Sequence, residues 1–174
     1  GAIAQKIIHQ NPNDENDYKE INTLTIGAPV GEKASAVMIA KDKILFIGGQ
    51  QKGEGYAASN EAIIIDISNS FNPKIEKKES MHYPRANADA TILPTGDVFV
   101  NGGTAIYQGA YDDTYFSNFT PEIYKTNDDI WEKMSKTNFK RNYHSTSLLL
   151  PDGRVFVAGG DVWNAQLFFP PYLF

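Results

Sequence analysis

Tyr143 and His144 are adjacent in the sequence, and their side chains are the best candidates for chemistry in this chain. An imidazole and a phenol can bind a transition-metal ion, and a phenol can also take or give a proton. The alternative is structural: a packed pair where a strand begins, with the histidine bonded to a backbone carbonyl. Adjacent side chains on a regular strand point to opposite sides, so the pair can reach one ligand only if residues 142–145 are irregular.

Other candidate residues are weaker. His82 and Tyr83 occupy the corresponding place in the preceding sequence unit, but in inverted order, which indicates packing. The Gly-Gly pairs open no helix, so no phosphate-binding loop is present. The chain has no cysteine, which excludes disulfides and thiolate metal sites.

The bulk composition excludes two classes of partner. The net charge is -5 with a pI near 5.2, and the basic residues form no stripe, so nucleic acid is not an expected partner. No apolar run approaches the roughly 20 residues that span a bilayer. The 174 residues begin at Gly1 without a methionine, which indicates an excised or processed product and leaves the compartment unknown.

The elements that must position Tyr143 and His144 are set by a repeat. Gly-Gly occurs at Gly48, Gly102 and Gly159, with spacings of 54 (102 minus 48) and 57 (159 minus 102). Each pair follows two apolar runs joined by a tight turn, at residues 36–47, 90–101 and 147–158. The Pro-Asp-Gly sequence at 151–153 predicts a hairpin, because glycine readily adopts positive φ.

Further strands follow each Gly-Gly pair. Third strands are expected at 62–67, 122–125 and 165–169, and fourth strands at 74–81 and 130–134. The pattern predicts an all-β, kelch-type β-propeller segment of four-stranded antiparallel blades, with about three blades and an incomplete ring. The expected units are a half blade at 1–29, blades at 30–81 and 82–136, and a last, three-stranded blade at 137–174.

A propeller of this kind needs more blades to close. We therefore expect the C-terminal part of a larger propeller, whose open ends are covered by missing blades or by self-association. Because strands alternate in direction, the long connections and residues 140–145 should share one face, opposite the tight turns. Residues 104–120 form the longest connection, and packing over the blade edge is favoured over a binding role. Its aromatic residues are Tyr107, Tyr111, Tyr115, Phe116 and Phe119.

Residues 141–155, which read RNYHSTSLLLPDGRV, form the most specific stretch in the chain. This stretch resembles the galactose oxidase and glyoxal oxidase group of kelch propellers, the copper radical oxidases. The likeness covers roughly residues 30–174 and includes residues 81–94, similar to the preceding blade of that group. Residues 170–174 resemble the exit from its propeller into a C-terminal sandwich domain.

The resemblance implies roles for two residues. Tyr143 would be the axial phenolate ligand of a copper ion and would take the proton from a bound alcohol. His144 would be an equatorial imidazole ligand. The parent protein would oxidise primary alcohols, carbohydrates among them, or aldehydes with O₂ at a copper–tyrosyl site, and would be secreted or extracellular.

The rest of the family's site is missing from this chain. The site also needs a cysteine joined to a second tyrosine, and a second histidine from the following domain. With two of four ligands, the chain alone should bind copper weakly or not at all and should have no oxidase activity. The alternative is a non-catalytic kelch module that binds a protein or a glycan, because propellers host many functions.

Overall fold

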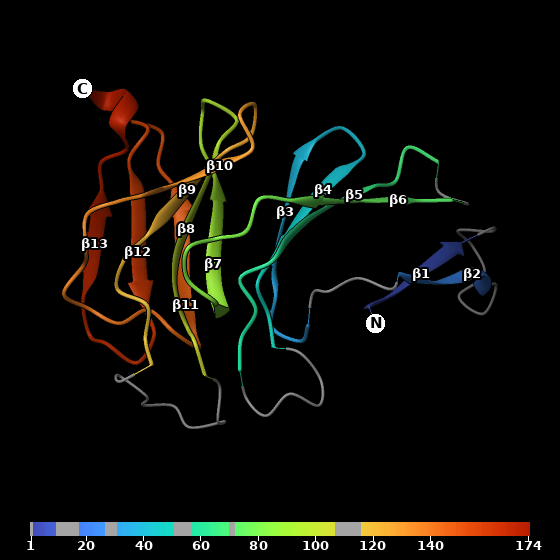
Figure 1. Cartoon of the computed structure of the whole chain (residues 1–174), viewed down its shortest axis with the longest axis horizontal. Coiled ribbons are helices and arrows are strands. Elements are labelled where there is room, and N and C mark those ends of the chain that lie inside the picture. Colours follow the sequence, from blue (N-terminus) through green and yellow to red (C-terminus); the bar gives the residue numbers. More distant parts are fainter. Residues whose placement is uncertain (1, 10–17, 27–30, 51–56, 70–71, 107–115) are drawn as a thin grey trace.

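A computed structural model describes residues 2–9, 18–26, 31–50, 57–69, 72–106 and 116–174. In these ranges the chain forms thirteen β-strands and one 3-10 turn (Figure 1). The strands lie in four separate antiparallel sheets, which are not closed into a ring. Within the described ranges, no helix has both the length and the apolar character needed to cross a bilayer. The predicted all-β fold of four-stranded antiparallel sheets is confirmed.

Each sheet is a meander in which strands consecutive in sequence are neighbours. The first sheet is a hairpin of β1 (Ala2–His9) and β2 (Tyr18–Ile26). The second contains β3 (Ser35–Ala40), β4 (Lys43–Ile47), β5 (Ala62–Asp66) and β6 (Lys74–Lys78). The third contains β7 (Ala86–Ile92), β8 (Val98–Thr104), β9 (Glu122–Lys125) and β10 (Ile130–Lys133). The last contains β11 (Ser145–Leu149), β12 (Val155–Gly159) and β13 (Ala165–Phe168), followed by the 3-10 turn Pro171–Leu173.

Tight turns and long connections lie at opposite ends of the sheets. The β11–β12 turn is closed by backbone hydrogen bonds from Leu150 to Arg154 and from Gly153 to Leu150, and the β7–β8 turn repeats this pattern. Figure 1 shows the β3–β4 turn and the C-terminus at the upper end, whereas β4 and β8 end toward the lower end. The lower end is called the loop face below.

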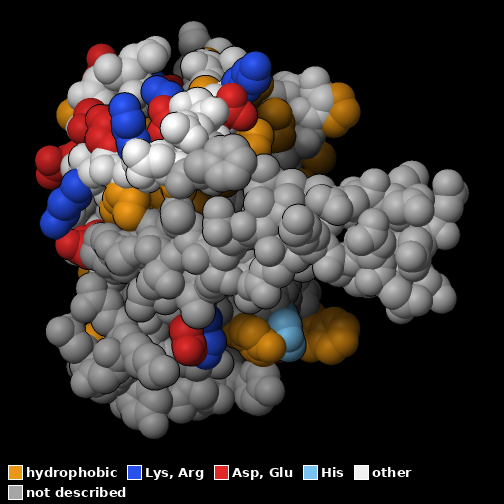
Figure 2. Space-filling view, turned by 90° about the vertical axis from the view of Figure 1, so that its right-hand side faces the viewer, with side chains coloured by type: hydrophobic (Ala, Val, Ile, Leu, Met, Phe, Trp, Pro, Cys, Tyr) orange, Lys and Arg blue, Asp and Glu red, His pale blue; other side chains and the backbone are white. Residues whose placement is uncertain are grey.

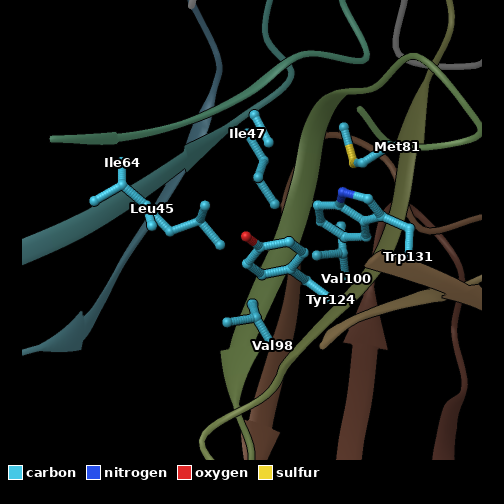
Figure 3. Close-up of a cluster of buried hydrophobic side chains, with 9 residues drawn as sticks. Leu45, Ile47, Ile64, Met81, Val98, Val100, Tyr124 and Trp131 are labelled. Carbon is cyan, nitrogen blue, oxygen red and sulfur yellow. The ribbon is translucent and has the colours of Figure 1, made fainter. Parts of the chain in front are cut away.

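The sheets pack face to face through alternating side chains. From β8, Val98 and Val100 enter a cluster with Leu45, Ile47 and Ile64 of the β3–β6 sheet (Figure 3). Phe99, between them, points to the other side and packs with Val155 and Val157 of the β11–β13 sheet. This period of two is the pattern of a strand buried on both faces.

Two aromatic contacts reinforce these interfaces. Trp131 of β10 is buried against Tyr124, and its indole Nε1 donates at 2.8 Å to the carbonyl of Glu79, which directly follows β6 of the preceding sheet. Phe99 stacks on Phe168 with ring centroids 4.3 Å apart. The second sheet is thus tied to the third, and the third to the last, by apolar burial, and at Trp131 also by a hydrogen bond.

The face of the last sheet that points away from the third sheet is not covered by another sheet in the described residues. Leu148, Phe156 and Leu167 are paired in register across β11, β12 and β13. Thr91, Phe99 and Ile123 make the corresponding row in the third sheet, where Phe99 and Ile123 are buried against the last sheet. The same row in the last sheet leaves Leu148 55% exposed and Leu167 42% exposed. The stack is therefore open at this end.

The outer strand of the second sheet faces water. Figure 2 shows Lys and Arg side chains interspersed with Asp and Glu side chains on this side of the molecule. The strand β6 exposes Lys74, Glu76 and Lys77. Charges of mixed sign on an edge strand hinder pairing with another chain.

Candidate functional site

The segments leading into β7 and β11 each contain a buried arginine, 56 residues apart (141 minus 85). The carbonyl of Arg85 accepts a hydrogen bond from Gly49 N, and the carbonyl of Arg141 accepts one from Gly103 N, both at 2.7 Å. The Gly-Gly pair of one sheet is thereby bonded to the segment that starts the next sheet. This repeated hydrogen bond holds neighbouring sheets together at the loop face.

Arg85 is held by a buried ion pair. Its Nη2 lies 2.9 Å from Glu122 Oε1, and both side chains are fully buried. Nη1 donates to the carbonyl of Gly102 at 2.6 Å, and Nη2 also donates to the carbonyl of Thr120. Burial lowers the pKa of Arg85, and the Glu122 carboxylate opposes that shift. The pair satisfies charges that would otherwise be costly to bury.

Glu122 also binds His82. Its Oε2 accepts from the His82 backbone N at 2.8 Å and lies 2.7 Å from His82 Nδ1. The structure therefore places His82 in packing and hydrogen bonding, in line with the structural interpretation of the His82–Tyr83 pair. Sequence reasoning missed the Arg85–Glu122 pair, although the recurrence of arginine at one place in two repeats was a usable signal.

Arg141 has the equivalent position in the last sheet, with neutral partners. Its Nη1 donates to the carbonyl of Gly159 at 2.9 Å, and Nη2 donates to Asn164 Oδ1 at 2.5 Å and to Gln166 Oε1 at 3.3 Å. Arg141 thus joins the start of β11 to the connection between β12 and β13. Tyr143 and His144 directly follow this arginine, in the segment that its hydrogen bonds hold in place.

Residues 142–145 form a turn and leave the regular strand. Ser145 N donates to the Asn142 carbonyl at 3.0 Å, and His144 has a φ of 63°. A positive φ at the third of four residues is the mark of a type II turn. The ring centroids of Tyr143 and His144 lie 3.7 Å apart, with an angle of 34° between the planes. The turn brings two consecutive side chains to one side, which a regular strand cannot do.

The turn coincides with one extra residue relative to the preceding sheet. Ser145 pairs with Gly159, as Ala88 pairs with Gly102. Arg141 is four residues before Ser145 (145 minus 141), whereas Arg85 is three residues before Ala88 (88 minus 85). Arg85 and Arg141 each donate to the carbonyl of the first glycine in the Gly-Gly pair of their own sheet. The extra residue must therefore be accommodated between Arg141 and the start of β11. That interval contains Tyr143 and His144.

The surroundings of the turn are well packed. Asn142, which is buried, donates from Nδ2 to Ser117 Oγ at 2.7 Å. Ser145 Oγ lies 2.6 Å from Asp89 Oδ2 of β7. Tyr143 is half-buried and His144 is exposed. The imidazole is therefore accessible while the backbone that carries it is fixed.

The donor types fit a copper ion, but the set is incomplete. An imidazole and a phenolate suit Cu(II), and here they come from adjacent rings. In the part of the chain that the structure describes, no three His, Cys, Asp or Glu side chains gather in a group that could hold a metal. Tyr107, Tyr111 and Tyr115 of the long connection lie outside the described residues.

Comparison with known proteins relates these features to a family. The family model described as "Glyoxal oxidase N-terminus" matches residues 40–170. A galactose oxidase of Gibberella zeae is 34% identical over 159 residues, which cover 84% of this chain and 23% of that protein. The aldehyde oxidase GLOX of Vitis pseudoreticulata is 38% identical over 99 residues, which cover 55% of this chain and 18% of that protein.

A solved structure supports the same relationship. It is that of a fungal alcohol oxidase of the AA5 family in complex with copper, with a TM-score of 0.72 and 27% identity. The similarity covers 82% of this chain and 32% of the oxidase chain, so this chain spans a third or less of the relatives that it matches. With residues 40–170 matched by the family model, this chain belongs to the glyoxal oxidase N-terminus family, and the resemblance to galactose and glyoxal oxidases is confirmed.

Proposed function

We propose that the protein to which this chain belongs is an oxidase that converts a primary alcohol or an aldehyde to its oxidised product at a copper–tyrosyl site. With an alcohol, two electrons and two protons leave the substrate and reduce O₂ to hydrogen peroxide. The observation that carries the proposal is the turn at 142–145, which places the rings of Tyr143 and His144 3.7 Å apart on the loop face. The oxidases among the relatives support it.

Each side chain has a separate task in this proposal. His144, exposed on a fixed backbone, would hold the metal through its neutral imidazole. Tyr143 would hold the metal as a phenolate and take the proton from the substrate hydroxyl. A bound copper ion would supply the one-electron redox chemistry that these side chains lack.

This chain does not hold the complete ligand set. The sequence has no cysteine, and the proposal assigns two ligands of the site, Tyr143 and His144, to this chain. We therefore expect the chain alone to bind copper weakly and to have no oxidase activity. The other ligands would come from other parts of the parent protein.

The test is oxygen consumption by the copper-loaded parent protein with a primary alcohol or an aldehyde. Tyr143→Phe should lower kcat by at least about 100-fold, the usual scale of a lost general base. Tyr172→Phe is the matched control, because it removes a phenol that donates to Gly153 O at the opposite end of the sheet. Equal activity of wild type and Tyr143→Phe would refute the proposal.

A non-catalytic module that binds a protein or a glycan is the second candidate. Trp163 favours it, because this side chain is fully exposed on the β12–β13 connection of the loop face. Exposed tryptophans are typical of binding surfaces. No oxygen consumption with copper present, together with glycan or protein binding that is lost in Trp163→Ala, would support this candidate over the oxidase.

A further inference from the structure

We propose that Asp89 is a positioning residue for the Tyr143–His144 turn, acting from the neighbouring sheet through Ser145. This inference rests on the proposed function and goes beyond the metal ligands that the family resemblance implies. Asp89 is on β7, the first strand of the third sheet, and Ser145 is the last residue of the turn and the first of β11. Ser145 Oγ lies 2.6 Å from Asp89 Oδ2 across the boundary between the two sheets.

The same serine hydroxyl also closes the turn. Asn142 is the first residue of the turn. Ser145 Oγ donates to its carbonyl oxygen at 2.7 Å, and Ser145 N donates to the same oxygen. Asp89 therefore acts on the group that links the two ends of the turn. Asp89 reaches the turn from β7, whereas Gly159, which pairs with Ser145, belongs to the same sheet as the turn.

A carboxylate oxygen at position 89 can accept a hydrogen bond from the Ser145 hydroxyl. The Ser145 hydroxyl has one hydrogen but has two oxygen neighbours within hydrogen-bond distance. The hydroxyl donates to Asp89 Oδ2 or to the Asn142 carbonyl oxygen, so one serine side chain bridges β7 and the first residue of the turn. In Asp89→Asn the amide oxygen can accept from the same hydroxyl.

A second hydroxyl contact between the same strands gives a matched comparison. Thr91 Oγ1 lies 2.7 Å from Ser147 Oγ and also donates to the Ser147 carbonyl at 3.0 Å. Both residues are two positions further from the turn than Asp89 and Ser145. Loss of this contact weakens the packing of β7 on β11 without touching the turn. A specific role for Asp89 is therefore separable from general packing between the sheets.

The experiment uses the full parent protein with Asp89→Ala, Asp89→Asn and Thr91→Val. In the copper-free protein, the Tyr143 and His144 rings should show a proton–proton nuclear Overhauser effect in wild type, Asp89→Asn and Thr91→Val. Asp89→Ala should lose this effect. Of the three variants, only Asp89→Ala should lose copper affinity. The expected loss is about 10- to 100-fold, as is usual when a residue that orients a metal ligand is removed. Because the proposed role of Asp89 is to position the turn and not to bind substrate, kcat should fall while KM is unchanged.

Two results would overturn the inference: wild-type ring proximity in Asp89→Ala, or an equal loss in Thr91→Val. If Asp89→Ala does not fold, Ser145→Ala removes the same contact with a smaller change and should give the same losses. The proposed function fails in a different way, when His144→Ala leaves copper affinity unchanged. The ring measurement in the copper-free protein still decides the role of Asp89 in that case.

Discussion

Substitution of Gly159 by alanine should damage the candidate site directly. A Cβ atom built at Gly159 lies 2.4 Å from the His144 carbonyl oxygen and 3.2 Å from Ser145 Cα. Real Cβ atoms do not approach closer than 3.0 Å, so the turn or β12 must move by at least 0.6 Å (3.0 minus 2.4). The atoms that meet the new methyl group belong to the backbone that carries His144.

Gly96 provides a matched control for the backbone conformation. Its φ is 83°, close to the 79° of Gly159, but a Cβ atom there meets nothing within 4 Å. Alanine at either position costs about 1–2 kcal/mol for a left-handed conformation. Gly159→Ala adds a steric term of about 1–3 kcal/mol. We therefore expect losses in the free energy of unfolding of about 1–2 kcal/mol for Gly96→Ala and about 2–5 kcal/mol for Gly159→Ala.

Urea denaturation measures the two losses, and nuclear magnetic resonance of the copper-free protein reports the Tyr143–His144 ring contact. Gly96→Ala should keep the contact and Gly159→Ala should lose it. Equal destabilisation by the two substitutions, or an intact ring contact in Gly159→Ala, would refute the reasoning. Either result would mean that the turn is not held by its packing against β12.

Two further predictions concern buried charge. Arg85→Met leaves the Glu122 carboxylate buried without its partner and should lower the free energy of unfolding by about 3–5 kcal/mol. Lys77→Met, which breaks the exposed pair with Glu61, should cost at most about 1 kcal/mol, and a similar loss in both variants would contradict the account. Burial raises the pKa of Asp89 to about 6 from 3.8, so the folded state keeps this proton to higher pH. The free energy of unfolding should therefore fall by up to about 3 kcal/mol as pH rises from about 4 to 6, and this component should be absent in Asp89→Asn.

The sequence was sufficient for the strand order because the relevant signals are local. The Pro-Asp-Gly turn at 151–153 and the apolar runs beside it predict the β11–β12 hairpin, and the structure has it. The alternation of Val98, Phe99 and Val100 is also a local pattern, and it determines which side chains face each neighbouring sheet. Each signal spans only a few residues.

The contacts that build the site are not local. Asp89 and Ser145 are 56 residues apart (145 minus 89), and neither has a sequence context that selects the other. The approach of the Tyr143 and His144 rings depends on one extra residue between Arg141 and β11, visible only once the pairing register is known. From periodicity alone, these two side chains would be expected on opposite sides of a strand.

The most direct test of the account is copper binding by the full parent protein and by its His144→Ala variant. Isothermal titration gives the affinity, and electron paramagnetic resonance of the Cu(II) form reports the nitrogen ligands. The account predicts an affinity at least about ten-fold lower in His144→Ala and the loss of one nitrogen ligand from the spectrum. Equal affinity and an unchanged spectrum in the two proteins would contradict the proposal that the 142–145 turn is part of a copper site.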